Sequence, residues 1–333
     1  MLKSKFKNLI TFLQNKRLLI TTHDLVDIDA LTSCFALKYF ISQVFNVEDV
    51  CVAFSEVSRP AREFLDKMNQ KFPEFDFFFT EMKNYPEFEV VLILDTNNLD
   101  LVKFKGEFTL PFIFIDHHTA SNKHYKHNLN TYNIISERYA STAEIIYDLY
   151  KQYNIILPNV ISWLLLCGLL VDSGTFKHGN NDTIRRASEI LNNDVDIQEI
   201  FSILRKDENI SEKMAKIKGL QRVEIIQAGE YLIAKSHVSA HEATVASTLL
   251  NVGFDVTIVL AQKKEEFRIS TRTRKHICIK TGLHLGKILD NIAERYQGTG
   301  GGHDGAAAIT GQGEYEIIME HLINEIRQIL KKE

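Results

Sequence analysis

The sequence predicts an α/β protein: a mainly parallel sheet with helices on both faces, a helical linker, and a second, smaller α/β domain. Segments 89–95 and 112–116 predict the parallel sheet, because both are nearly all apolar until they end in a carboxylate. Continuous apolar runs of this kind are typical of strands that are covered on both faces. The length of 333 residues favours two domains, since one domain usually takes about 100–200 residues.

The elements of the first half alternate between strand and helix patterns. The short apolar run 18–22 ends in a polar loop, and apolar residues at helical spacing follow it across 31–40. The segment from Ser141 to Glu144 has the form of a capping box, so it should begin a helix that runs through Tyr150. Two further strands and one buried helix complete the expected first domain: 50–54, 76–80 and 160–171.

The second half begins with a change of composition near residue 180. Segment 182–218 is charged and helical and has no strand pattern, which suits a linker. A second α/β block follows, with strands expected at 231–234, 256–261 and 267–273, a helix at 283–296 and another helix from Tyr315. The expected limits are 1–185 for the first domain, 186–227 for the linker and 228–333 for the second domain.

Composition excludes several classes of protein. The 39 basic and 43 acidic residues give a net charge of −4, which argues against a polyanion binder that acts through bulk charge. Four scattered cysteines without a C-x-x-C exclude a zinc ribbon and a disulfide scaffold, and they indicate a reducing compartment. The N-terminus lacks a signal-peptide pattern, and the longest apolar run, 160–171, falls short of the ~20 residues of a membrane span. We therefore expect a cytoplasmic protein that does not use a membrane.

Acidic and histidine side chains follow the predicted elements at four separate places. Taken singly, an aspartate after a strand usually caps a helix or forms a turn, and a lone histidine usually has a structural role. Parallel strands, however, bring such residues to one edge of the sheet. Burying so many carboxylates together is costly unless cations compensate them, so the sequence predicts a metal centre. The candidates are His23, Asp27, Asp29, Asp95, Asp116, His117, His118 and Asp172.

The ligand types restrict the metal. Aspartate and histidine without cysteine suit Mn²⁺ best, with Mg²⁺, Co²⁺ and Fe²⁺ as alternatives, and ions that prefer thiolates are excluded. The candidate groups are more numerous than one ion needs. Two ions about 3.5–4 Å apart would use them, as in enzymes that displace a phosphoryl group.

The four motifs resemble those of the DHH phosphoesterase superfamily. They are H-x-x-x-D-x-D-A at 23–30, the aspartate at 95, D-H-H at 116–118 and V-D-S-G-T-F at 171–176. The resemblance implies that one ion is bound by His23 and Asp27, that the other is bound by Asp29, His117 and Asp172, and that Asp95 bridges both. It also implies that Asp116 orients a ligand imidazole and that His118 lies beside the scissile phosphate as a hydrogen-bond donor or general acid.

The second domain has features of a phosphate-binding site. Arg268, Ser270, Arg272 and Arg274 alternate, so a strand would place them on one face, although a solvated edge strand would also explain them. Three consecutive glycines let a phosphate approach the backbone, although a helix-ending turn would explain them too. The run G-G-G-H at 300–303 resembles the motif of the DHH-associated domain, and R-x-S-x-R at 268–272 resembles the strand before it. The resemblance assigns substrate binding to Arg268, Ser270, Arg272, Gly300, Gly301, Gly302 and His303.

This resemblance covers nearly the whole chain and is greatest to the nanoRNase/pAp-phosphatase branch. Members of that branch hydrolyse very short oligonucleotides and often 3′-phosphoadenosine 5′-phosphate. The resemblance therefore implies a two-metal phosphoesterase that uses hydroxide formed from water at the metals. Its partners would be short single-stranded oligonucleotides or nucleotide phosphates, and a homodimer is compatible with this function.

Four alternatives stay open. A RecJ-type exonuclease shares both motif sets but usually carries further domains, for which 333 residues leave little room. A phosphodiesterase for linear or cyclic dinucleotides is close in chemistry. A catalytically inactive scaffold would be expected to lose metal ligands, whereas every position here holds a suitable residue. A family II pyrophosphatase shares the first-domain motifs, but its second domain carries a lysine- and arginine-rich motif in place of G-G-G-H.

Overall fold

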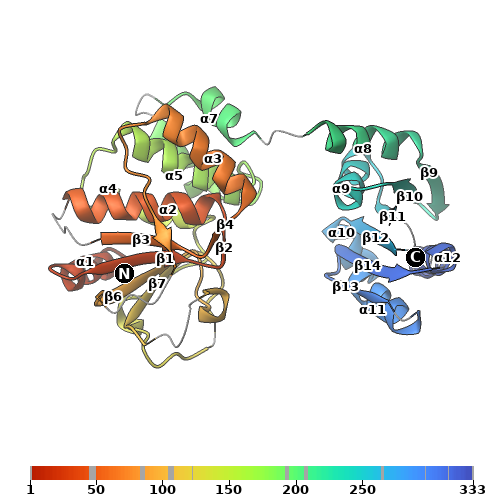
Figure 1. Cartoon of the computed structure of the whole chain (residues 1–333), viewed down its shortest axis with the longest axis horizontal. Coiled ribbons are helices and arrows are strands. Elements are labelled where there is room, and N and C mark those ends of the chain that lie inside the picture. The colour runs from red at the N-terminus through yellow and green to blue at the C-terminus, as the bar shows by residue number, and fades with distance from the viewer. Residues whose placement is uncertain are drawn as a thin grey trace. The chain divides into compact units, whose positions relative to one another are not determined.

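The computed structural model divides the chain into two compact units, residues 1–206 and 207–333, which are described separately below (Figure 1). The described residues are 2–44, 50–82, 87–103, 109–121, 123–191, 195–205, 209–263, 266–296, 298–313 and 315–331. In these ranges no helix is both long enough and apolar enough to cross a membrane.

The first unit is built on a six-stranded sheet with the order β5-β3-β1-β6-β7-β8. Every pair of neighbouring strands in this sheet is parallel, which confirms the predicted fold class. Strands β2 and β4 form a separate two-stranded parallel sheet. The strands are β1 (Leu18–Thr22), β2 (Leu25–Val26), β3 (Val50–Phe54), β4 (Glu56–Val57), β5 (Thr80–Glu81), β6 (Val90–Leu94), β7 (Phe112–Asp116) and β8 (Ile134–Ile135).

The two faces of this sheet are covered differently. The helices pack on one face in the main core, where Leu18 and Ile20 of β1 meet residues of α1, α2, α4 and α5. In the described residues the other face is covered by loop side chains and a 3₁₀ helix (Leu99–Leu101), not by the α-helices that were expected on both faces. The segments after β6 and β7 have no helical periodicity, and they supply residues such as Val102 and Tyr125 instead. The helices are α1 (Leu2–Leu13), α2 (Ile28–Tyr39) with a π-helical turn (Phe40–Val44), α3 (Arg59–Lys71), a 3₁₀ turn (Asn130–Tyr132), α4 (Thr142–Gln152), α5 (Asn159–Asp172), α6 (Asn181–Leu191) and α7 (Ile197–Leu204).

The second unit has a mixed six-stranded sheet with the order β13-β14-β12-β11-β10-β9. Only β10 and β11 are parallel among its described pairs. Helices α10 to α12 pack on one face, and α8 and α9 cover the β10–β11 part of the other. Its elements are α8 (Ile210–Gln221), β9 (Glu224–Ala228), β10 (Tyr231–Val238), α9 (Glu242–Val252), β11 (Val256–Lys263), β12 (Glu266–Thr273), α10 (Lys275–Thr281), α11 (Leu285–Arg295), β13 (Thr299–Gly302), β14 (Ala306–Gln312) and α12 (Tyr315–Leu330).

Two predicted segments differ from the structure. Most of the strand expected at 76–80 is irregular, because the side chain of Asp76 accepts the N–H of Phe78. Only Thr80–Glu81 pair with β3. The range 186–227, expected as a linker, contributes to both units: most of α6 and all of α7 belong to the first, and α8 packs against α9 in the second. Positions 192–194 and 206–208 of that range lie outside the described residues.

Candidate metal centre

The candidate centre lies at the carboxyl edge of the parallel sheet. Strands β1, β6 and β7 are neighbours, and His23 follows β1, Asp95 follows β6, and Asp116 is the last residue of β7. The N–H of Asp95 still donates to the carbonyl of Ile115 at 2.9 Å, so the pairing holds β6 and β7 together up to the site. Strand register therefore brings these three side chains to one place.

The loop between β1 and α2 supplies Asp27 in two roles. Its Oδ1 accepts the N–H of Ala30 at 3.0 Å and caps helix α2. Its Oδ2 lies 3.9 Å from Nε2 of His23, which lies 3.6 Å from Oδ2 of Asp95. The cap of helix α2 therefore uses one carboxylate oxygen of Asp27, and the other oxygen faces His23.

His117 gives the clearest indication that this cluster fits a cation. Its Nε2 is buried and has no hydrogen-bond partner among the described residues. The same atom lies 3.1 Å from Oδ2 of Asp172 and 3.3 Å from Oδ1 of Asp95. These contacts do not meet the geometry of a hydrogen bond, and imidazole with carboxylate oxygens is a donor set that divalent ions accept. The residues present therefore fit the divalent ions that the sequence predicts.

Among the described residues the potential ligand atoms form three groups, and in each group they lie within 4.8 Å of one another. Asp95 belongs to all three, is 3% exposed, and has a left-handed backbone with φ of 58°. This conformation is costly for a residue other than glycine, and strain of this kind tends to occur at functional sites. The groups are His23, Asp27 and Asp95; Asp29, Asp95, His117 and Asp172; and Asp95, Asp116, His117 and His118.

The pKa shifts at the candidate centre indicate a surplus of negative charge. Burial, with the charge of Asp95 second, raises the pKa of Asp27 to about 6 and also raises the pKa of Asp29. Burial would raise the pKa of Asp95 as well, but its contacts with His117 and His23 lower that pKa to about 2. Burial disfavours a charged His117, yet Asp172 and Asp95 raise its pKa to about 11. Without bound cations, protons must balance these carboxylates.

His118 is held by a chain of hydrogen bonds that starts at Asn97. The Nδ1 of His118 lies 2.8 Å from Oδ1 of Asp116, and that oxygen also accepts the N–H of His118. Asn97 donates to the other oxygen of Asp116 and accepts the N–H of Ser121 at 2.7 Å. The bond to Asp116 raises the pKa of His118, with burial opposing it. The imidazole is therefore fixed at Nδ1, while its side chain remains 56% exposed.

The sequence prediction missed several residues that support the centre. Asn97 carried no recognisable signal beyond its position two residues after Asp95. Thr142 and Ala143 donate to Asp29, and the hydroxyl of Thr142 donates to Asp95. Their signal was the capping box, which located the start of α4 but not what that start faces.

The arginine strand of the second unit presents the expected alternation. Arg268, Ser270 and Arg272 share one face of β12, and Ser270 is 1% exposed with no hydrogen-bond partner for its hydroxyl among the described residues. Burial, with the charge of Arg268 second, lowers the pKa of Arg272. Arg274 does not share this face, because β12 ends at Thr273 and Arg274 stands at the N-cap position of helix α10, where its side chain donates to the Leu250 carbonyl.

The glycine run forms the edge strand β13. Helix α11 ends at Arg295, so the run is not the helix-ending turn considered as its structural alternative. Gly301 pairs with Ala308, which in turn pairs with Ser270, so the glycines align with the arginine strand across the sheet. Gly301 has φ of 146° and open space where a Cβ would lie. His303 follows the strand and is exposed.

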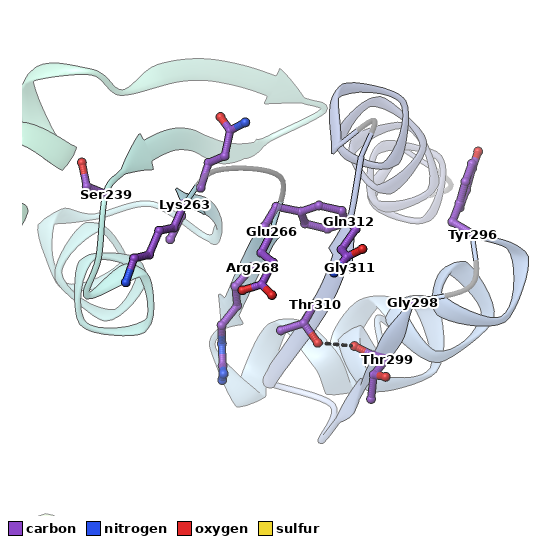
Figure 2. Close-up of a pocket in the computed structure, with 13 residues that line it drawn as sticks. Ser239, Lys263, Glu266, Arg268, Tyr296, Gly298, Thr299, Thr310, Gly311 and Gln312 are labelled. Atoms are coloured by element: carbon purple, nitrogen blue, oxygen red, sulfur yellow. Dashed lines mark hydrogen bonds between the residues drawn. The ribbon is translucent and has the colours of Figure 1, made fainter.

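A hollow of about 740 Å³ lies beside the same strands. Figure 2 shows Arg268, Thr310 and Thr299 extending from neighbouring strands to one side, with the Thr310 hydroxyl donating to the Thr299 carbonyl at 3.2 Å. The Nε of Arg268 lies 3.1 Å from Oε1 of Glu242 at the start of α9. The hollow therefore combines polar groups with a guanidinium that is paired with Glu242.

Comparison with known proteins identifies both halves of the chain. Residues 17–169 match the model of the DHH family, N-terminal domain, and residues 228–332 match the DHHA1 domain. The uncharacterized protein MJ0988 of Methanocaldococcus jannaschii is 32% identical, over 97% of this chain and 96% of its own length. A probable bifunctional oligoribonuclease and PAP phosphatase NrnA of Streptococcus mutans is 24% identical, over 94% of this chain and 95% of its own.

A solved structure has the same fold. The exopolyphosphatase-related protein from Bacteroides fragilis aligns with a TM-score of 0.64 and 18% identity, over 99% of this chain and 96% of that one. At this identity the likeness concerns the fold alone. The two family models together cover most of the chain: it belongs to the DHH family and carries a DHHA1 domain in its second half.

Proposed function

We propose that the protein is a phosphoesterase that uses two divalent cations, with Mn²⁺ preferred, to hydrolyse short oligonucleotides and 3′-phosphoadenosine 5′-phosphate. One cation would be held by His23, Asp27 and Asp95, and the other by Asp29, Asp95, His117 and Asp172. The observation that carries the proposal is the shared position of Asp95, whose carboxylate lies near Nε2 of both His23 and His117. The name of the Streptococcus mutans relative, an oligoribonuclease and PAP phosphatase, supports both substrate classes.

Bound divalent ions would neutralise phosphoryl oxygens and lower the pKa of water. The chain's own contribution is the imidazole of His118. Since Nδ1 is fixed by Asp116, Nε2 is left to donate a hydrogen bond or proton to a phosphate or leaving oxygen. The hydrogen bond to Asp116 raises the pKa of His118, which favours the protonated imidazole.

The second unit would hold the part of the substrate that does not react, through Arg268, Ser270, Arg272, Gly300, Gly301, Gly302 and His303. The composition of the face supports this role. It combines two guanidinium groups with small side chains and a Ser270 hydroxyl that has no partner among the described residues. Phosphate accepts hydrogen bonds from guanidinium, hydroxyl and exposed backbone N–H groups alike.

The experiment is an activity assay on the purified protein with Mn²⁺. Substrates are single-stranded oligonucleotides of two to twenty-four residues, and 3′-phosphoadenosine 5′-phosphate. The proposal expects oligomers of two to five nucleotides to be cleaved faster than long ones, release of phosphate from 3′-phosphoadenosine 5′-phosphate, and complete loss of activity with a chelator. Processive degradation of the long strands would favour the RecJ-type alternative, and chelator-resistant activity would contradict the metal centre.

A further inference from the structure

The amino end of helix α4 touches two different carboxylates of the centre. The N–H of Thr142 donates to Oδ2 of Asp29 at 2.7 Å, and the N–H of Ala143 donates to Oδ1 of Asp29 at 3.0 Å. The hydroxyl of Thr142 donates to Oδ1 of Asp95 at 2.9 Å. Asp29, Thr142 and Ala143 are fully buried. Thr142 is therefore bonded to both aspartates at once.

Helix capping accounts for only part of this arrangement. The first N–H groups of a helix need partners from outside it, and a carboxylate there is favoured by the helix dipole. Ser141 already fills the capping position, since its hydroxyl accepts the N–H of Glu144 at 3.2 Å. Capping explains why Asp29 accepts two N–H groups. It does not require the bond from the Thr142 hydroxyl to Asp95, which closes no helical N–H.

The packing around Asp29 is tight. A Cβ at Gly168 of α5 would lie 2.7 Å from Oδ1 of Asp29 and 2.9 Å from Cβ of Ala143. The same Cβ would lie 2.5 Å from Oγ1 of Thr32. Helices α2, α4 and α5 thus meet at the position where the carboxylate of Asp29 is held.

We infer that Thr142 is a positioning residue for both cations: its hydroxyl orients the shared Asp95, and its N–H orients Asp29. The inference rests on the proposed function, because it takes these two aspartates as metal ligands. Asp29 accepts two of these bonds and Asp95 accepts one. Carboxylate oxygens accept more than one interaction, so lone pairs are left for a cation. Partners of metal ligands usually contribute about 10–100-fold to metal affinity.

The test measures Mn²⁺ binding by calorimetry without substrate. Thr142→Val keeps the shape and the N–H but removes the hydroxyl, and it should weaken Mn²⁺ binding by about 10–100-fold. Thr142→Ser restores the hydroxyl and should bind as the wild type does. The matched control is Thr257→Val in the second unit, which loses an equally buried hydroxyl bond, to the Ala246 carbonyl, and should leave Mn²⁺ binding unchanged.

Each outcome separates the inference from the proposed function. Wild-type Mn²⁺ affinity in a folded Thr142→Val, or a Thr142→Ser as weak as Thr142→Val, would overturn the role of the hydroxyl. If Thr142→Val does not fold, Thr142→Ala serves as the second hydroxyl-free variant, with the same expected loss and the same contradicting result. The proposed function fails instead if Asp95→Ala binds Mn²⁺ as the wild type does, whatever Thr142 variants show.

Discussion

The candidate centre of the first unit and the arginine face of the second unit are built in opposite ways. Asp29 and Asp116 are 0% exposed, and each accepts hydrogen bonds that fix its direction. On the second face Arg268 is exposed, and Ala308 and Gly301 occupy the strands beside Ser270. Ligand atoms for a metal must stay at fixed positions, whereas a substrate face needs room. Substitutions should therefore abolish function in the first unit and only weaken binding in the second.

The largest effect is expected for Asp95→Ala, because its carboxylate belongs to every group of potential ligands. Its kcat should fall by more than the ~10²–10³-fold that the loss of one charge-stabilising group costs. The matched control is Asp100→Ala, an exposed aspartate on the loop after β6 that pairs with Lys123, and it should be unaffected. Steady-state kinetics with a dinucleotide measure both, and wild-type turnover in Asp95→Ala would refute the two-metal assignment.

Substitutions on the arginine face of the second unit should mainly raise KM. A charge-assisted hydrogen bond contributes about 1.5–3 kcal/mol, so Arg272→Ala and His303→Ala should lose roughly 10- to 150-fold in kcat/KM, mainly through KM. Bound metal should stay at the wild-type level in both. His118→Ala should instead lower kcat, since this side chain is held beside the centre. Metal loss in His303→Ala, or unchanged kcat/KM, would remove the G-G-G-H segment from substrate binding.

Gly168 and Gly219 allow overpacking at the candidate centre to be compared with overpacking elsewhere. A Cβ at Gly168 would lie 2.7 Å from Oδ1 of Asp29, and a Cβ at Gly219 would lie 2.3 Å from Cγ1 of Val245 in the second unit. Gly168→Ala and Gly219→Ala should each lower the free energy of unfolding by about 1–3 kcal/mol, because overpacking strains a tight contact. Only Gly168→Ala should also weaken Mn²⁺ binding. Denaturant unfolding and Mn²⁺ titration check this, and equal Mn²⁺ affinity in both variants would count against a rigid Asp29.

The smallest effect concerns salt. The chain is acidic overall and the basic face is local, so few phosphates should be neutralised on binding. Each neutralised phosphate of a single strand contributes about −0.7 to the slope of log affinity against log salt. We expect a shallow slope for short oligonucleotides, measured by fluorescence anisotropy with Ca²⁺ in place of Mn²⁺. A steep slope would indicate a long binding track and favour the RecJ-type alternative.

Sequence patterns could predict the first unit further than the second. The apolar strands that end at Asp95 and Asp116 indicated both the parallel sheet and the edge where the candidate centre lies, because chain direction alone brings those ends together. Patterns could not show that the start of α4 faces Asp29, because Thr142 and Asp29 lie 113 positions apart in the sequence. They also could not show that the glycine run is an edge strand, because glycine permits turn and strand alike.

The helix coverage of the first sheet was the part that sequence could predict least. A fully apolar strand such as β6 indicates that both faces are covered, but not by what. One face of this sheet packs on helices, and the other packs on loop residues such as Tyr125. Loop side chains carry no periodic signal, so this difference appears only in the fold.

Equilibrium dialysis against Mn²⁺ tests the proposed metal centre most directly, since it counts bound ions without assuming a substrate. The wild-type chain should bind two Mn²⁺ ions, and Asp95→Ala should bind markedly less at the same free concentration because its carboxylate serves both sites. Binding of no Mn²⁺ by the folded wild type, or two ions with unchanged affinity in Asp95→Ala, would contradict a centre that shares Asp95.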